Sequence, residues 1–167
     1  MTISTQLVIH SETFPELLEK IANIKSIRWQ YPLEKQLQWM TDNLKSTDVH
    51  LLVHADDKLV AYTNFVDVKV LINEASERFM GIGNVCTSES GKGYGEMLMN
   101  AINDSILKNN WNGILLCKDN LVPYYEKYQW NLISPSVISS DIMKEINTMT
   151  FNFEKKIETL QYSDRNF

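Results

Sequence analysis

The sequence predicts an α/β protein with helices packed on a mixed β-sheet, because helical and strand-like segments alternate along the chain. Segments with apolar residues at helical spacing stand between short runs rich in β-branched and aromatic residues. A turn with three glycines, "SGKGYG" at residues 90–95, separates one such run from an amphipathic segment. These observations favour a layered domain, and the last one also indicates where a ligand binds.

The length and composition fit one globular domain. The chain has 167 residues, of which 44% are hydrophobic and 22% are charged, and typical domains contain roughly 100–200 residues. We expect residues 1–154 to form the domain and residues 155–167 to form a C-terminal tail.

The net charge of −5 argues against nucleic-acid binding, which normally requires a basic patch. No apolar run approaches the roughly 20 residues that span a membrane. The first residues also lack the basic and apolar segments of a secretion signal. We therefore expect a cytoplasmic protein with no nucleic-acid and no membrane partner.

The first part of the chain predicts one strand, two helices and a hairpin. Residues 6–9 are short and β-branched, which is typical of a strand. Helices are predicted from Pro15 and over residues 33–44, because apolar side chains recur on one side of each segment. Residues 49–55 and 59–72 predict two strands joined by the turn "DDK".

The later elements follow the same alternation. Residues 78–87 predict a strand that leads into the glycine-rich turn, and residues 93–108 predict a helix with one apolar face. Residues 113–117, "GILLC", form a continuous apolar run, as expected for a central strand covered on both faces. A short helix from Pro123 and a strand over residues 147–154 follow, with an extra strand near "NLISP".

Cys86 and Cys117 both lie inside strand-like apolar runs. Without a CxxC motif or a secretion signal, neither a disulfide nor a zinc site is expected. Two small buried side chains are the favoured interpretation. We predict no metal site.

A glycine-rich turn between a strand and a helix is typical of sites that bind phosphate through backbone N–H groups. Gly91, Gly93 and Gly95 lack side chains that would block an anion, and Lys92 adds a positive charge. The turn does not match the nucleotide P-loop, because a glycine follows Lys92. It does not match the dinucleotide fingerprint either, because positions 96 and 98 are not glycine.

The segment "NVCTSESGKGYGEMLM", residues 84–99, resembles the acyl-CoA-binding motif of the GNAT N-acetyltransferases. Val85, Gly91, Gly93 and Gly95 match the valine and the glycines of that motif.

A second segment, "LVPYYEKYQW", resembles the family motif that ends in Phe-Tyr-x-Lys-x-Gly-Phe. Tyr124, Tyr125, Lys127 and Trp130 are in register with it. Both motifs occur in the family's order, and the predicted elements have the order of the GNAT fold. The resemblance therefore implies a GNAT-like mixed, mostly antiparallel central sheet flanked by helices.

Three positions depart from the family pattern. Thr87 stands where proline is common, Ser90 where arginine or glutamine is usual, and Gln129 where glycine is usual. The short side chain of Ser90 is expected to weaken one pyrophosphate contact but to leave the backbone donors in place.

The resemblance implies an N-acetyltransferase that uses acetyl-CoA, without a metal, to acetylate an amine by direct attack in a ternary complex. The backbone of Val85, Cys86 and Thr87 is expected to pair with the pantetheine arm. The pyrophosphate is expected to bind the N–H groups of Ser90, Gly91, Lys92, Gly93, Tyr94, Gly95 and Glu96.

Tyr125 matches the family tyrosine that often donates a proton to the coenzyme A thiolate, a role that suits a phenol of ordinary pKa near 10. The adjacent Tyr124 is the better candidate for simple packing. A covalent role for Cys86 would require a neighbouring base, and no histidine lies close to it in the sequence.

The general base is left open. Glu74 and Glu77 precede the glycine-turn strand, and His50 and His54 have a spacing that places them on one face of their strand. Solvated carboxylates and structural histidines fit these positions at least as well, and His10 at a strand end is uninformative.

The resemblance places the acceptor site in the helical region that contains Trp29, Tyr31 and Trp39. We expect a small-molecule primary amine, and the acidic net charge weakly favours a cationic one. Acetylation of a protein lysine or N-terminus is one alternative, and a non-catalytic acyl-CoA-binding module is another. A longer acyl group, and a homodimer rather than a monomer, are also left open.

Overall fold

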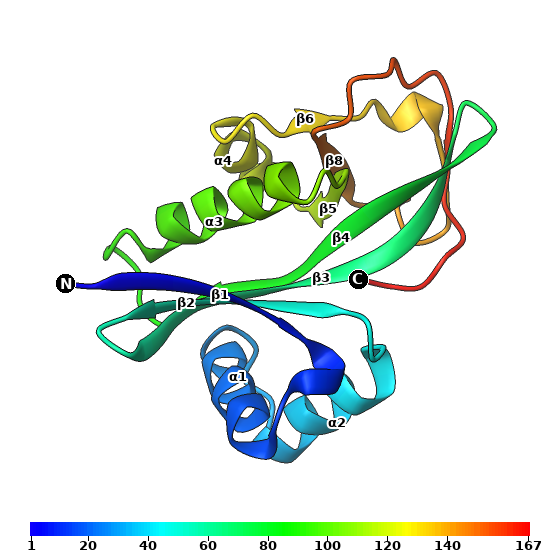
Figure 1. Ribbon diagram of the computed structural model, residues 1–167. Coiled ribbons are helices and arrows are strands. Elements are labelled where there is room, and N and C mark those ends of the chain that lie inside the picture. The colour runs from blue at the N-terminus through cyan, green and yellow to red at the C-terminus, as the bar shows by residue number, and fades with distance from the viewer. The chain divides into compact units, whose positions relative to one another are not determined.

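The computed structural model describes residues 1–167 and has the predicted order of helices and strands (Figure 1). The helices are α1 (Pro15–Arg28), α2 (Leu33–Asn43), α3 (Tyr94–Lys108) and α4 (Val122–Glu126). The strands are β1 (Ile3–Ile9), β2 (Val49–Ala55), β3 (Lys58–Ile72), β4 (Ala75–Thr87), β5 (Gly113–Cys117), β6 (Asn131–Leu132), β7 (Ile138–Ser139), β8 (Asn147–Phe151) and β9 (Leu160–Gln161). The strand expected near "NLISP" is β6, which has two residues. β7 and β9, also of two residues each, were not predicted.

The strands form a mixed, mostly antiparallel sheet in the order β1-β2-β3-β4-β5-β8-β6, with β9 pairing with β3 and β7. β4 is parallel to β5 and β7 to β9, while β1–β2, β2–β3, β5–β8 and β6–β8 are antiparallel. This confirms the predicted fold class.

The chain divides into two compact units that share β3, β4 and α3. The first comprises Met1–Val66 and Gly83–Ile102, and the second comprises Asp67–Ile82 and Asn103–Phe167.

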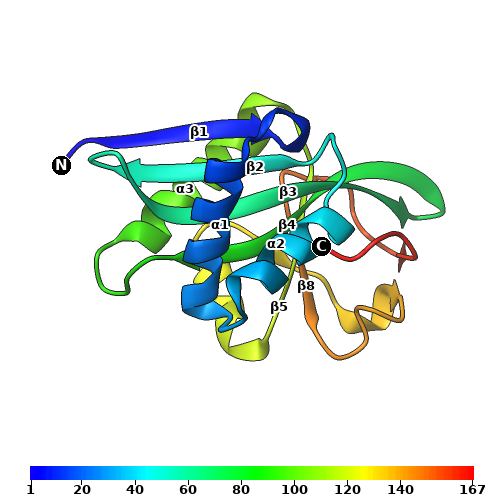
Figure 2. The same ribbon diagram turned by 90° about the horizontal axis from the view of Figure 1, so that it is seen from below.

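In the first unit, α1 and α2 cover one face of β1, β2 and the start of β3, and the start of α3 lies on the other face (Figures 1 and 2). Ile21 of α1, Leu52 of β2 and Leu98 of α3 are fully buried, so apolar side chains from both helical layers contribute to the core. The β2–β3 turn contains Asp56 (φ +47°) and Asp57 (φ +66°), the pair of left-handed residues that a two-residue hairpin prefers.

In the second unit, β5 lies between β4 and β8, and it is a buried central strand as predicted. The first residue of β5, Gly113, has to be a glycine, because a Cβ atom there would lie 2.7 Å from Cη2 of Trp130. The Trp130 ring stacks on Phe151 with 5.4 Å between the centroids, and its Nε1 donates to Oδ1 of Asn103 at 3.0 Å. The aromatic residue of the second motif therefore anchors this core.

The C-terminal residues pack within the second unit. Leu160 and Gln161 of β9 pair with Ile72 and Leu71 of β3, and Leu160 is fully buried. The Phe167 ring occupies the space beside Gly81, where a Cβ atom would lie 2.5 Å from Cγ of Phe167. Burial of these side chains stabilises the end of the chain against the sheet.

None of the helices combines the length and the apolar character that a membrane crossing requires.

Candidate functional site

The glycine-rich turn follows β4 in the first unit and leads directly into α3. Gly91 (φ +74°) and Gly93 (φ +78°) have left-handed backbone conformations, which explains why glycine stands at both positions. A Cβ atom at either glycine would meet no atom within 4 Å, so the space beside the turn is open. The turn thus exposes backbone to an approaching ligand.

The N-terminus of α3 supplies backbone donors at this turn. The N–H of Met97 donates to the carbonyl oxygen of Gly93 at 3.2 Å. The first N–H groups of any α-helix lack partners within the helix. A helix of this length places partial positive charge at its N-terminus. Lys92 is exposed on the same turn. Together these groups suit an anion such as a pyrophosphate.

The strand before the turn has the unpaired edge that the pantetheine arm is expected to use. β5 pairs with β4 only at Met80, Gly81 and Ile82, and β4 then continues to Thr87 without a β5 partner. Asn84 distorts this part of β4, because its φ is +56° and its Nδ2 donates to Oδ1 of Asn64 at 2.6 Å.

Cys86 and Cys117 are both buried and free, as predicted. Burial raises the pKa of the Cys86 thiol to about 12, so the group is a neutral thiol at neutral pH. Burial also raises the pKa of Cys117. A thiol with a raised pKa is a poor nucleophile, which argues against a covalent role for Cys86.

Tyr125 lies in α4 of the second unit, and its side chain is largely buried. Its carbonyl oxygen accepts the N–H groups of Tyr128 at 3.0 Å and Trp130 at 3.2 Å, which closes the turn after α4. The ring contacts Tyr124 edge to face with centroids 5.2 Å apart. Tyr124 is the less buried of the two, so burial alone does not separate a packing tyrosine from a catalytic one.

Gln129 has φ +65°, the left-handed conformation that the family's glycine would adopt without strain. The departure from the motif therefore preserves the turn. Replacing Gln129 by glycine should raise the free energy of unfolding by about 1 kcal/mol, because the strain of a left-handed side-chain residue is removed.

Chemical denaturation of the parent and of Gln129→Gly tests this prediction. Lys127→Gly is the matched control, since Lys127, the C-cap of α4, has a right-handed backbone with φ −55° and glycine there should destabilise by about 0.5–1 kcal/mol. Equal destabilisation by both glycines would show that the turn does not require a left-handed residue.

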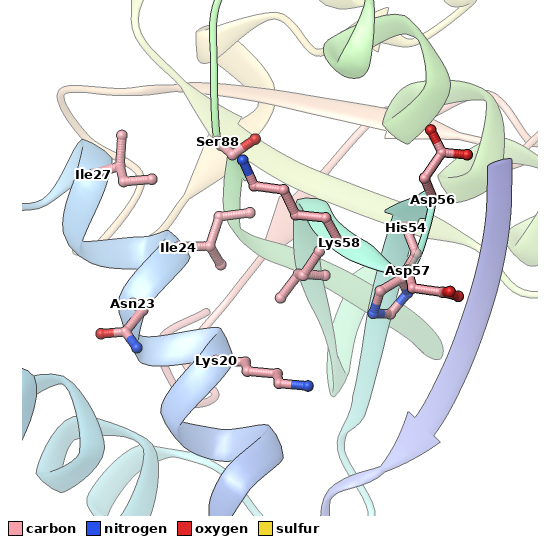
Figure 3. Close-up of a pocket in the computed structure, with 10 residues that line it drawn as sticks. Lys20, Asn23, Ile24, Ile27, His54, Asp56, Asp57, Lys58 and Ser88 are labelled. Atoms are coloured by element: carbon pink, nitrogen blue, oxygen red, sulfur yellow. The ribbon is translucent and has the colours of Figure 1, made fainter. Parts of the chain in front are cut away.

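A polar cavity of about 580 Å³ lies in the first unit beside the start of the glycine turn (Figure 3). It is lined by Lys20, Asn23, Ile24, Ile27, His54, Asp56, Asp57, Lys58, Leu59 and Ser88. Figure 3 shows Lys58 extending toward Ser88, whose Oγ is buried without a hydrogen-bond partner. Lys58 also lies 3.8 Å from the Glu89 carboxylate, an exposed and therefore weak ion pair. This cavity could not be predicted from the sequence, because its residues come from separate segments.

A second cavity in the first unit, of about 370 Å³, lies between α1, α2 and β4. It is lined by Lys25, Trp29, Tyr31, Lys35, Gln36, Trp39 and Asn84, and we call it the aromatic cavity. The three aromatic residues are those that the resemblance assigned to the acceptor region. Lys25 was not singled out from the sequence, because a lysine on an amphipathic helix normally faces solvent.

Lys25 is only 2% exposed, and burial lowers its pKa to about 8. Its Nζ lies 4.2 Å from the centroid of the Trp39 ring, a cation–π contact.

The candidate bases are dispersed. His50 is fully buried on β2, where its Nε2 lies 2.9 Å from Nδ1 of His10 and its Nδ1 lies 2.6 Å from the Tyr62 hydroxyl. Burial lowers the pKa of His50 to about 4, so the ring is neutral at neutral pH. His54 instead lines the polar cavity. The structure thus gives the two strand histidines different surroundings.

Neither carboxylate candidate has surroundings that indicate a base. The Glu77 carboxylate pairs with Nζ of Lys155 at 2.7 Å, and Glu74 is exposed in the β3–β4 turn with φ +70°. No group of three or more histidine, cysteine, aspartate or glutamate residues lies close enough together to hold a metal ion.

Comparison with known proteins gives matches in structure but not in sequence. No model of a protein family matches the chain, and no curated protein is similar to it in sequence. An acyl-CoA N-acyltransferase of Pseudomonas aeruginosa is similar in structure with a TM-score of 0.65 and 17% identity, over 89% of this chain and 99% of the other. Escherichia coli ElaA has a TM-score of 0.62 and 19% identity over the same shares of the two chains.

A third similar structure is the N-acetyltransferase YlbP of Bacillus subtilis in complex with coenzyme A. It has a TM-score of 0.60 and 13% identity, over 90% of this chain and 96% of the other. Together with the sheet order, these likenesses show that the chain has the fold of the GNAT acyl-CoA N-acyltransferases.

Proposed function

We propose that the protein is an N-acetyltransferase that transfers the acetyl group of acetyl-CoA to a primary amine of a small molecule. The observation that carries the proposal is the turn at Gly91 and Gly93, just before α3. Both glycines have left-handed backbone conformations, and no atom lies within 4 Å of the position of a Cβ atom at either one. The fold shared with acyl-CoA N-acyltransferases supports it.

The chain's own groups suit the anionic part of acetyl-CoA. The backbone donors of the turn, the α3 N-terminus and Lys92 favour the pyrophosphate electrostatically. The partnerless Oγ of Ser88 is a further hydrogen-bonding group beside the turn. The unpaired edge of β4 at Val85, Cys86 and Thr87 is available to the amides of the pantetheine arm.

The transfer itself requires one bond to form and one to break. The lone pair of a neutral amine attacks the thioester carbonyl, the C–N bond forms and the C–S bond breaks. The amine nitrogen loses a proton, and the coenzyme A thiolate takes one up. In this proposal Tyr125 donates the proton to the thiolate. Holding the amine beside the thioester carbonyl accounts for much of the rate enhancement, because the two reacting groups are already close together.

Calorimetric titration with acetyl-CoA tests the cofactor site. The parent should bind it with a micromolar dissociation constant. Gly93→Asn and Gly93→Asp form a matched pair, because both residues tolerate left-handed backbone and have similar shape. The aspartate should weaken binding at least about 10-fold more than the asparagine, since only it places a negative charge beside the phosphates.

Failure of the parent to bind acetyl-CoA would refute the proposal. Equal binding by the two variants would show that the phosphates do not lie at this turn.

Release of free thiol from acetyl-CoA on addition of amines distinguishes the remaining functions. Turnover with small amines supports the proposal, and turnover only with peptides identifies a protein acetyltransferase. Tight binding without turnover on any amine identifies a non-catalytic acyl-CoA-binding module.

A further inference from the structure

The side chain of Lys25 stands out because it is a buried cation without a counter-ion. It is 2% exposed, and no ion pair in the structure includes it. Removing an ammonium from water is costly unless an opposite charge or hydrogen bonds replace the lost hydration. The contact with the face of Trp39 at 4.2 Å offsets only part of that cost.

The groups around Lys25 do not supply the missing negative charge. Cys86 on β4 is a neutral thiol, because burial raises its pKa to about 12. His50 on β2 is a neutral ring, because burial lowers its pKa to about 4. The other ionisable side chains here, Lys35 of α2 and Arg28 of α1, are basic and supply no carboxylate. A ligand is therefore the natural source of a counter-ion.

Lys25 lines the aromatic cavity, which contains no aspartate or glutamate. The polar amides of its wall are already engaged, since Gln36 Nε2 donates to the Trp29 carbonyl at 2.9 Å and Asn84 Nδ2 donates to Asn64. Lys35 also lines the cavity, but it is exposed to solvent. Lys25 is thus the buried charged donor of the wall. A single buried cation in an apolar cavity matches one negative charge better than a doubly charged phosphate, whose second charge would stay unpaired.

The rest of the cavity wall is suited to a flat or apolar group. Trp29, Tyr31 and Trp39 contribute aromatic surface, and about 370 Å³ lies at the lower end of the range for small-molecule sites. Asn84, which also lines the cavity, directly precedes Val85, where the pantetheine arm is expected to pair. An acceptor in this cavity would lie next to the strand that carries the acyl donor.

We propose that the aromatic cavity binds the acyl acceptor and that Lys25 holds a carboxylate on it. The substrate is then an amine that bears a carboxylate beside an aromatic or apolar group. This inference rests on the proposed acetyltransferase function. It replaces the expectation of a cationic acceptor. A charge inside the cavity acts on the ligand at short range and is poorly screened. The net charge of −5 is instead spread over the surface and screened by salt.

Calorimetric titration without acetyl-CoA tests the inference with three probes. Phenylacetate has the ring and the carboxylate, phenethylamine has the ring and the amine, and L-phenylalanine has all three groups. Phenylacetate and L-phenylalanine should bind at least about 10-fold more tightly than phenethylamine. Their binding should weaken as the pH rises from about 7 to 9.5, because Lys25 then loses its charge.

Lys25→Met removes the charge and keeps the length of the side chain. It should weaken binding of the two carboxylates at least about 10-fold. Binding of phenethylamine should stay the same or become tighter, because a like charge has been removed. The melting temperature of Lys25→Met should equal or exceed that of the parent, because an unpaired buried charge has been removed. Lys20→Met, an exposed lysine of the same helix outside this cavity, should leave all three affinities unchanged.

Three results would overturn the inference: phenethylamine binding as tightly as phenylacetate, no carboxylate probe binding the parent, or full binding retained in Lys25→Met. Because no acetyl-CoA is present, these results are independent of the cofactor titration. Binding of acetyl-CoA with turnover of other amines, but no binding of phenylacetate, would refute the inference alone.

Discussion

Replacing Tyr125 by phenylalanine should lower the turnover number by about 100- to 10,000-fold and leave the affinity for coenzyme A unchanged. General acid catalysis by a positioned side chain contributes a factor of this size. The variant removes only the hydroxyl, so the largely buried ring and its contact with Tyr124 are kept. Steady-state kinetics with a reactive amine, together with calorimetric titration of coenzyme A, measures both quantities.

Tyr124→Phe is the matched control, because it removes the same hydroxyl from the neighbouring position of α4. We expect it to change the turnover number less than about 3-fold, because the half-buried Tyr124 is given no role in proton transfer. A similar loss in both variants, or full turnover by Tyr125→Phe, would exclude Tyr125 as the acid.

Acidification from pH 6.5 to pH 4 should remove about 3 kcal/mol from the free energy of unfolding through His50. The pKa of this fully buried ring is lowered to about 4, mainly by burial and next by the neighbouring His10. Between these pH values the unfolded chain binds a proton that the folded protein excludes. The contribution of His50 to the free energy of unfolding is therefore fully present above pH 6.5 and is lost as the pH falls to 4. Burial lowers the pKa of His10 as well, which acts in the same direction.

Denaturation curves measured across this pH range check the prediction. His50→Gln should have a much shallower pH dependence, whatever its stability at neutral pH, because the titrating group is gone. His54→Gln, on the same strand but lining the polar cavity, should keep the full dependence. If the free energy of unfolding of His50→Gln fell with pH as steeply as that of the parent, groups other than His50 would cause the acid sensitivity.

The fold could be predicted from the sequence because its elements are encoded locally. The apolar spacing in α1, α2 and α3, and the continuous apolar run of β5, follow from the periods of helix and strand. The glycine turn was also visible, because positive φ at Gly91 and Gly93 requires glycine whatever surrounds the turn. β7 and β9 were missed, because their two residues become strands only by pairing with each other and, for β9, with the distant β3.

The tertiary structure alone decided the surroundings of individual polar side chains. Lys25 looks like a solvated helix residue in the sequence, and only the packing of α1 on β4 and α2 makes it a buried cation facing a cavity. His10 and His50 are separated by 40 positions, yet antiparallel pairing of β1 with β2 brings their rings within hydrogen-bond distance. Local pattern determines which element a residue belongs to. Burial and charge depend on which distant segments fold against it, so the pKa and the ligand preference of these groups could not be read from the sequence.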